Sequence, residues 1–249
     1  MEASAEKPGN VTPTKSFEDL TYRDFVAAAE RLEPFIERAA KDGEKADIGK
    51  LIYDATPGKK NINFGIIIMF MPLAACRGGS TKKLLKSLTL EDTAWIVKAM
   101  QKGELGGMGL RDLKLSKYDV YSEKIFEIIK TENKTPLGLM GMATPYDTLA
   151  GEWIDDYPIS RAIAKRIDSD PHTIINEYLR CLAEKPDTLI ARKAGLEKAR
   201  EVSQMAKWAI GGNLSMDDFD YFLRSQGNYL NPGTTADLIA TGLFLKLLD

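Results

Sequence analysis

The sequence predicts an all-α protein, folded as one multi-helix domain over residues 1–249. Apolar residues recur at helical spacing along most of the chain. Alternating runs of β-branched residues, which are typical of half-buried strands, are scarce. Two apolar stretches follow capping-box patterns, Thr21-x-x-Asp24 and Thr89-x-x-Asp92. Because the chain has no internal repeat and no linker, a single helical domain is expected.

The first third of the chain predicts three helices. One runs from Thr21 to about Lys41 with a single apolar face, and a shorter one spans 47–55, stopped by Pro57. Residues 61–75 are apolar almost all round, which predicts a buried helix that Pro72 kinks.

The rest of the chain is also predicted to be helical, with two interruptions. Residues 103–109 are rich in glycine without the Gly-Lys-Ser/Thr ending of a nucleotide-binding loop, and we interpret them as a flexible lid or connector. Residues 137–144 are expected to be irregular because they are dominated by Gly and Met. Helices are expected over residues 89–100, 116–132, 147–168 with a break near Pro158, 171–184, 188–210, 216–224 and 235–248.

Composition limits the possible functions. The net charge of −2 provides no general attraction for nucleic acid or anionic membranes, so an anionic ligand needs a local site. The single histidine excludes a His-dependent triad or a multi-His metal site. The two cysteines form no disulfide or zinc pattern, and the most apolar run, 66–76, is too short to span a bilayer. Without a visible signal peptide, we expect a cytoplasmic protein with neither nucleic-acid nor membrane partners.

The chain starts in an unusual way. Residues 1–5 resemble the last turns of a helix. Two interpretations remain open: an upstream helix is missing from this sequence, or that helix is very short here.

The segment from Asn231 to Asp237 is the most informative motif. Pro232 and Gly233 precede Thr234 and Thr235, which fall in the first turn of a helix. The free N–H groups and the positive dipole end of such a turn can hold a phosphate. An N-cap with an acidic first turn is the alternative.

A second motif runs from Pro186 to Gly195. Asp187 can cap a helix, while Thr188, Arg192 and Gly195 fall at i, i+4 and i+7 and are expected to share one face. Arg192 can make a forked contact to phosphate, and Gly195 permits close approach. A solvated charged face is the alternative.

Two further loops have polar residues that suit a nucleotide. Lys7 and Asn10 flank Pro8-Gly9, which suits a phosphate-contacting loop or an ordinary turn. Asn61 and Asn63 open an apolar helix and either bind a nucleobase or ribose, or cap the helix.

Four carboxylates are candidates for acid/base chemistry, and the sequence does not rank them. They are Asp119, Asp147, Asp187 and Asp237.

Taken together, the motifs resemble the triphosphoribosyl-dephospho-CoA synthase family, in particular its archaeal-type members. The resemblance spans nearly the whole chain. The matching segments are 7–11, 17–19, 61–65 with 72–75, 106–109, 186–201 and 231–238, of which the last two are the most specific.

The chain departs from the bacterial members of the family. Where those carry His-Lys before the glycine of the second motif, this chain has Asn63-Phe64. Their Ser-Pro-Gly-Gly-Ser-Ala-Asp and His-Arg-Gly-Gly motifs are here 231–237 and 191–195. The changed second motif concerns the acceptor substrate more than the nucleotide.

The resemblance implies a transferase whose substrates are ATP and 3′-dephospho-CoA. The 2′-hydroxyl of dephospho-CoA displaces adenine from C1′ of the ATP ribose, and the triphosphate stays on the product. Two alternatives stay open: the same chemistry with another coenzyme acceptor, such as one of the pterin type, or a helical nucleotide-binding protein without turnover. The resemblance does not indicate the oligomeric state.

The resemblance also suggests roles for individual residues. Asp237 and Asp187 are the candidate catalytic carboxylates, and Asp237 is favoured as a ligand of Mg²⁺, which is expected with ATP. The predicted ATP-binding residues are Lys7, Asn10, Asn61, Asn63, Thr188, Arg192, Gly233, Thr234 and Thr235.

Overall fold

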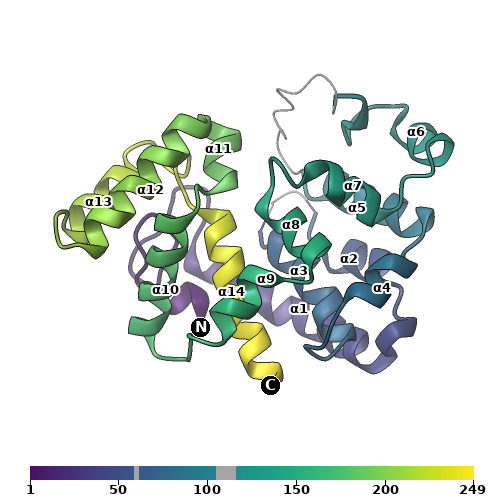
Figure 1. The fold of residues 1–249 in the computed structure, drawn as a ribbon, viewed down its shortest axis with the longest axis horizontal. Helices are drawn as coiled ribbons and strands as arrows, with labels where there is room; N and C mark the ends of the chain where they lie inside the picture. The colour runs from purple at the N-terminus through teal and green to yellow at the C-terminus, as the bar shows by residue number, and fades with distance from the viewer. Residues whose placement is uncertain (59–61, 105–115) are drawn as a thin grey trace. The chain divides into compact units, whose positions relative to one another are not determined.

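The computed structural model describes residues 1–58, 62–104 and 116–249. Within these ranges the chain forms fourteen α-helices, three 3-10 helices and no strand, which confirms the all-α prediction (Figure 1). No helix in these ranges combines the length and apolar character needed to cross a bilayer.

The chain divides into two compact units. Unit 1 consists of Met1–Ala27, Tyr146–Thr148 and Pro158–Asp249, and unit 2 of Ala28–Pro145 and Leu149–Tyr157. The expectation of a single domain over residues 1–249 stays a prediction.

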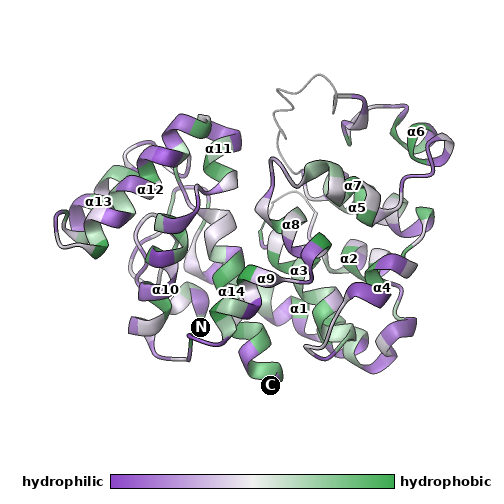
Figure 2. Ribbon diagram, in the orientation of Figure 1, coloured by the Kyte–Doolittle hydropathy of each residue, from purple (hydrophilic) through white to green (hydrophobic). Residues whose placement is uncertain are grey.

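Helix α14 organises unit 1. It packs against α9, α10, α11 and η1, and Figure 2 shows it green or white over most of its length, whereas α12 and α13 mix green with purple. A Cβ atom on Gly242 would lie 2.4 Å from Cγ2 of Ile163 in α9, so glycine permits the close crossing. The helices of this unit are η1 Glu2–Ser4, α9 Pro158–Ala164, α10 Pro171–Glu184, α11 Thr188–Ala194, α12 Leu196–Ile210, α13 Met216–Arg224 and α14 Gly233–Leu248.

In unit 2, α3 is largely buried, with Pro72 among its buried residues. Pro72 lacks an N–H and cannot donate to the carbonyl of Ile68 four residues earlier. Nε1 of Trp153 donates to that carbonyl at 3.2 Å instead, so the buried proline is tolerated. The helices of this unit are α1 Tyr22–Asp42 and α8 Thr148–Asp155, which both begin in unit 1, η2 Gly43–Lys45, α2 Ile48–Ala55, α3 Phe64–Ala75, α4 Lys82–Ser87, α5 Leu90–Lys102, η3 Ser116–Tyr118, α6 Ile125–Thr131 and α7 Pro136–Ala143.

The two predicted capping boxes both lie at helix starts, since Thr21 and Asp24 exchange hydrogen bonds at the start of α1. The predicted capping box at Thr89 and Asp92 is present at the start of α5. Asp47 caps α2 by accepting a hydrogen bond from the Lys50 N–H at 3.0 Å. The predicted break near Pro158 is confirmed, because Asp156 and Tyr157 adopt left-handed φ angles of 64° and 62° between α8 and α9.

Two predictions about helix continuity were wrong. The helix expected over 116–132 is divided into η3 and α6, because Asp119 accepts a hydrogen bond from the Tyr121 N–H at 3.0 Å and closes a turn. The helix expected over 188–210 breaks at Gly195, whose φ of 94° is incompatible with a continuing helix.

Two further segments form helices that the sequence did not indicate. Residues 137–144 were expected to be irregular, yet α7 forms there because Thr135 caps it and Pro136 occupies its first position. The short helix α4 was also not predicted.

Candidate functional site

The site in unit 1 is built on the amino ends of α11 and α14. Asp187 precedes α11 and caps it, since its Oδ1 accepts from the backbone N–H groups of Leu189 at 2.9 Å and Ile190 at 3.1 Å. Helix α14 has no side-chain cap from its own N-cap residue, because Pro232 at that position makes no side-chain hydrogen bond. Its first turn therefore needs a partner from elsewhere in the chain.

Asp187 is that partner. Its Oδ2 accepts from both the backbone N–H of Thr235 at 2.7 Å and the Thr235 hydroxyl at 2.8 Å. The carboxylate is only 2% exposed. Burial raises the pKa of Asp187, and the hydrogen bonds from Thr235, Ile190 and Leu189 oppose that rise.

Threonine hydroxyls join the same two helix ends. The hydroxyl oxygens of Thr188 and Thr234 lie 3.2 Å apart, and Thr234 Oγ1 accepts from the Leu189 N–H at 3.1 Å. Thr188 Oγ1 also accepts from the Thr148 N–H at 3.3 Å. The segment that carries Asp147 is therefore attached to the same junction.

Asp147 and Arg192 form an ion pair beside this junction. Nη1 of Arg192 lies 2.7 Å from Oδ2 of Asp147, and both side chains are partly exposed. Thr188 and Arg192 lie one turn apart on α11, as predicted, but Gly195 does not share their face because the helix ends there. The prediction for Gly195 was wrong because its left-handed backbone ends the helix.

Asp237 is the most perturbed carboxylate of the site. It is half-buried on α14, and within the described ranges its carboxylate takes part in no hydrogen bond or ion pair. Burial raises the pKa of Asp237 well above its ordinary value, and the negative charges of Glu2, Asp187 and Asp147 raise it further, opposed by Arg192. Such a carboxylate is a candidate functional group.

The amino-terminal segment contributes an ion pair to this region. The Lys7 ammonium is buried and donates to the carbonyls of Glu2 at 2.5 Å and Ala5 at 3.1 Å, and it lies 3.0 Å from the Glu2 carboxylate. Lys7 therefore stabilises the chain start, and its predicted contact with phosphate stays a prediction.

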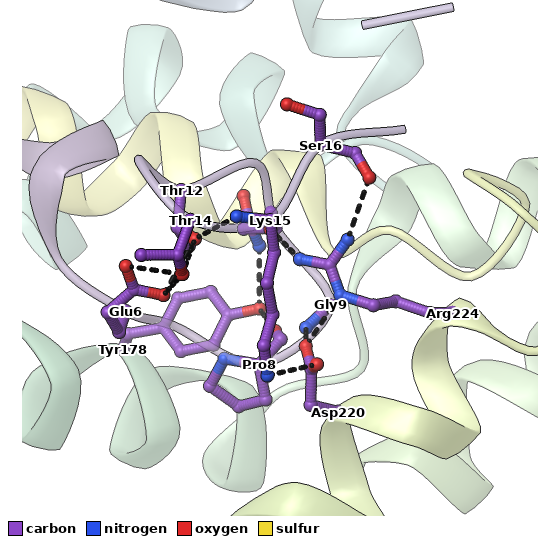
Figure 3. A network of polar contacts seen from close by, with 11 residues as sticks. Glu6, Pro8, Gly9, Thr12, Thr14, Lys15, Ser16, Tyr178, Asp220 and Arg224 are labelled. Carbon is purple, nitrogen blue, oxygen red and sulfur yellow. Dashed lines mark hydrogen bonds and ion pairs between the residues drawn. The ribbon is translucent and has the colours of Figure 1, made fainter. Parts of the chain in front are cut away.

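The loop that carries Asn10 is held by a polar network, shown in Figure 3. Asn10 Nδ2 donates to the Tyr178 hydroxyl at 2.7 Å, and that hydroxyl donates to the Pro8 carbonyl at 2.8 Å. Gly9 has a φ of 73°, and a Cβ there would lie 2.6 Å from Leu223. These contacts support the loop itself, and the predicted binding of ATP by Asn10 stays untested.

Asp220 anchors the same loop to α13. It accepts from the Gly9 N–H at 2.8 Å, from Lys15 Nζ at 2.9 Å and from Arg224 Nε at 2.8 Å, as Figure 3 shows. Burial acts to raise the pKa of Asp220, but the bonds from Gly9, Lys15 and Arg224 outweigh it and lower the pKa.

This network predicts acid sensitivity. Because the pKa of Asp220 is lower in the folded than in the unfolded chain, its stabilisation is present above the unfolded pKa of about 4 and is lost as pH falls through the folded pKa. Asp220→Asn is expected to lose about 2–4 kcal/mol of unfolding free energy at pH 7 and less at pH 3.

Urea denaturation at pH 7, 5, 4 and 3 measures this difference. Asp217→Asn, an exposed carboxylate on the same helix, is the control and should follow the wild type. Parallel acid slopes in wild type and Asp220→Asn would contradict the prediction.

Of the two asparagines predicted to contact the nucleotide, Asn61 and Asn63, the structure describes only Asn63, which lies in unit 2. Asn63 precedes α3 with a left-handed φ of 65°, and its side-chain Oδ1 is buried without a hydrogen-bond partner among the described residues. A strained residue with an unsatisfied acceptor is a common feature of functional sites. Asn61 and the glycine-rich stretch 106–109 lie outside the described residues.

The carboxylates of Glu2, Asp187 and Asp147 act on Asp237 and bear on the expected Mg²⁺ site. Among the residues in 1–58, 62–104 and 116–249, no group of three or more His, Cys, Asp or Glu side chains could hold a metal ion by itself. Magnesium with nucleotides is usually held by one or two carboxylates together with phosphate oxygens and water. Asp237 fits that role because its neighbours create a negative field and leave the carboxylate without a hydrogen-bonded partner.

The structure thus brings together one group of predicted residues in unit 1. The residues at this junction are Asp187, Thr188, Arg192, Gly233, Thr234, Thr235 and Asp237.

Sequence reasoning missed two contributors to this region. Glu2 adds negative charge at Asp237, and no local pattern distinguishes a glutamate so near the chain start. Oδ1 of Asn231, next to α14, is buried without a partner in the described part of the chain. Its place in the motif of residues 231–237 was the available signal.

Comparison with known proteins identifies the family of this chain. The sequence model of the ATP:dephospho-CoA triphosphoribosyl transferase family matches residues 1–249. The fold is similar to the crystal structure of a candidate triphosphoribosyl-dephospho-CoA synthase from Archaeoglobus fulgidus, with a TM-score of 0.69 and 24% sequence identity over 90% of this chain and 98% of that chain. No curated protein sequence matches the chain. The match along its whole length shows that the chain belongs to the ATP:dephospho-CoA triphosphoribosyl transferase family.

Proposed function

We propose that this chain transfers the triphosphoribosyl group of ATP to the 2′-hydroxyl of 3′-dephospho-CoA at the junction of α11 and α14. In this reaction the bond between C1′ and adenine breaks and a bond between C1′ and the attacking oxygen forms. The hydroxyl loses its proton and adenine takes one up. Membership of the family, whose description names ATP and dephospho-CoA, favours this acceptor over a pterin-type coenzyme.

The observation that supports this site is the isolated carboxylate of Asp237 beside Arg192 and the amino end of a sixteen-residue helix. Arg192 is placed to make a forked contact with phosphate oxygens. The positive end of the α14 dipole adds attraction for the triphosphate. The hydroxyls of Thr234 and Thr235 already bond within the junction, so we assign them to shaping the turn that faces the nucleotide.

Asp237 would hold Mg²⁺ against the triphosphate. When bound, the ion supplies positive charge that neutralises the phosphates. The negative field that raises the pKa of Asp237 also favours a cation at that carboxylate. The role of Asn63 in orienting ribose or adenine stays a prediction, for which its buried and unpaired Oδ1 is the supporting observation in unit 2. Because ATP and coenzyme precursors are the substrates, we propose that the reaction takes place in the cytoplasm.

Release of adenine tests the proposal. Purified protein with ATP, MgCl₂ and dephospho-CoA is expected to form adenine and a joined product in equal amounts, followed by chromatography and mass spectrometry. Neither product is expected without dephospho-CoA. Adenine released only with another coenzyme acceptor would overturn the choice of acceptor, and ATP binding without adenine release would overturn catalysis.

A further inference from the structure

The carboxylate of Asp187 caps two helices at once. One oxygen accepts two backbone N–H groups at the start of α11, and the other accepts two donors from Thr235 at the start of α14. Asp170, by comparison, caps only α10, by accepting from the His172 N–H at 2.8 Å. Asp187 therefore joins two segments that are 48 residues apart in the sequence.

The hydrogen bonds leave Asp187 unsuited to receive a proton from a substrate. Each oxygen already accepts two hydrogen bonds, and the residue is 2% exposed. A proton on either oxygen would face donors instead of acceptors, so Asp187 could take up a proton only by giving up at least one of these four hydrogen bonds.

The two helices joined by Asp187 carry the charged groups of the site. Arg192 follows on α11 and Asp237 follows on α14, and their charges interact. The first turns of both helices are fixed by the same carboxylate, so its loss would free each helix end to move relative to the other.

We propose that Asp187 is a positioning residue that clamps the first turns of α11 and α14 together. The clamp fixes the positions of Arg192 and Asp237 relative to each other, so that both can contact the nucleotide. The inference rests on the proposed function for the identity of that nucleotide. The clamp itself is defined by the four hydrogen bonds of Asp187.

Substitution by asparagine separates this role from that of a base. In Asp187→Asn one oxygen becomes an NH₂ group that faces two donors, so one helix end loses its cap. Asp170→Asn is the matched control, because Asn caps a single helix about as well as Asp. We expect Asp187→Asn to lower the thermal midpoint by several degrees and Asp170→Asn to leave stability and activity at the wild-type level.

A double-mutant cycle with Thr235→Val provides the decisive readout. This variant keeps the backbone N–H and removes only the hydroxyl that donates to Asp187. If Asp187 clamps the helices, both single variants raise the dissociation constant for ATP with MgCl₂, about tenfold for Asp187→Asn and less for Thr235→Val. The double variant is then no weaker than Asp187→Asn, since both changes break the same clamp.

Calorimetry and thermal melting report this cycle without turnover, so failure of the clamp is distinguishable from failure of the proposed reaction. Unchanged ATP affinity in Asp187→Asn together with a loss of kcat of about 1,000-fold or more would identify a base and overturn the proposal. Strictly additive effects of the two substitutions on affinity and melting would overturn it as well. Thr235→Val keeps the test available if Asp187→Asn does not fold.

Discussion

Asp237→Asn is expected to slow adenine release at least about 100-fold while making the protein more stable. Burial and the charges of Glu2, Asp187 and Asp147 raise the pKa of Asp237 in the folded chain. A carboxyl group with a raised folded pKa contributes stability that is present below its unfolded pKa and is lost as pH rises through the folded pKa. At neutral pH an aspartate of the unfolded chain is ionised, so the raised pKa of Asp237 lowers the stability of the folded chain. The amide of asparagine does not titrate and removes that penalty.

The expected gain is about 1 kcal/mol in the free energy of unfolding at pH 7, the usual size of a single stabilising substitution. The expected loss of kcat/KM is about 100- to 1,000-fold, the range found when a charge-stabilising group is removed from an active site. Urea denaturation and adenine chromatography measure the two effects on the same preparation. Stability gained with activity lost is the usual mark of a residue kept for function.

The gain in stability should also depend on pH. Because Asp237 becomes neutral as pH falls, the difference between variant and wild type should shrink toward pH 4. Asp217→Asn is again the control, since it removes an exposed carboxylate from the same unit. An Asp237→Asn protein that is less stable than the wild type at pH 7, or that turns over normally, would remove Asp237 from the site.

Arg192→Ala is expected to lower kcat/KM for ATP about 100-fold, mainly through a higher KM, which corresponds to about 2.7 kcal/mol. Arg192→Lys keeps the charge without the forked geometry and should recover only part of this loss. Arg200→Ala is the matched control, because that arginine is exposed in the same unit and pairs with Glu197 at 2.7 Å. Its kinetics should equal those of the wild type.

The partner of Arg192 provides a second test of the same contact. Nη1 of Arg192 is held 2.7 Å from Asp147, so Asp147→Asn should loosen the guanidinium without removing it. We expect a rise in KM for ATP smaller than that in Arg192→Ala. A KM for ATP that is unchanged in Arg192→Ala would show that this arginine does not contact the nucleotide.

Local sequence signals predicted most helices because caps and breakers act over a few residues. The capping box at Thr89 is present as predicted, and the short helix expected over 47–55 forms as α2. The errors in helix continuity occurred where a local residue is compatible with either a continuing helix or a helix end. A glycine such as Gly195 is tolerated within a helix or ends it, and apolar periodicity continues on both sides of the break.

The sequence by itself determined the residue types of the site and the helices that carry them. The motifs that contain Asp187, Arg192, Thr234 and Asp237 each begin at or near a helix end, and that property is encoded by neighbouring residues. Only the tertiary structure decided what each polar group does. It showed that Asp187 is saturated by donors from two helices, that Lys7 is buried in a pair with Glu2, and that Asp237 has no hydrogen-bonded partner in the described chain. The physical reason is that hydrogen bonding and burial depend on residues far apart in the chain, which packing brings together and local patterns do not specify.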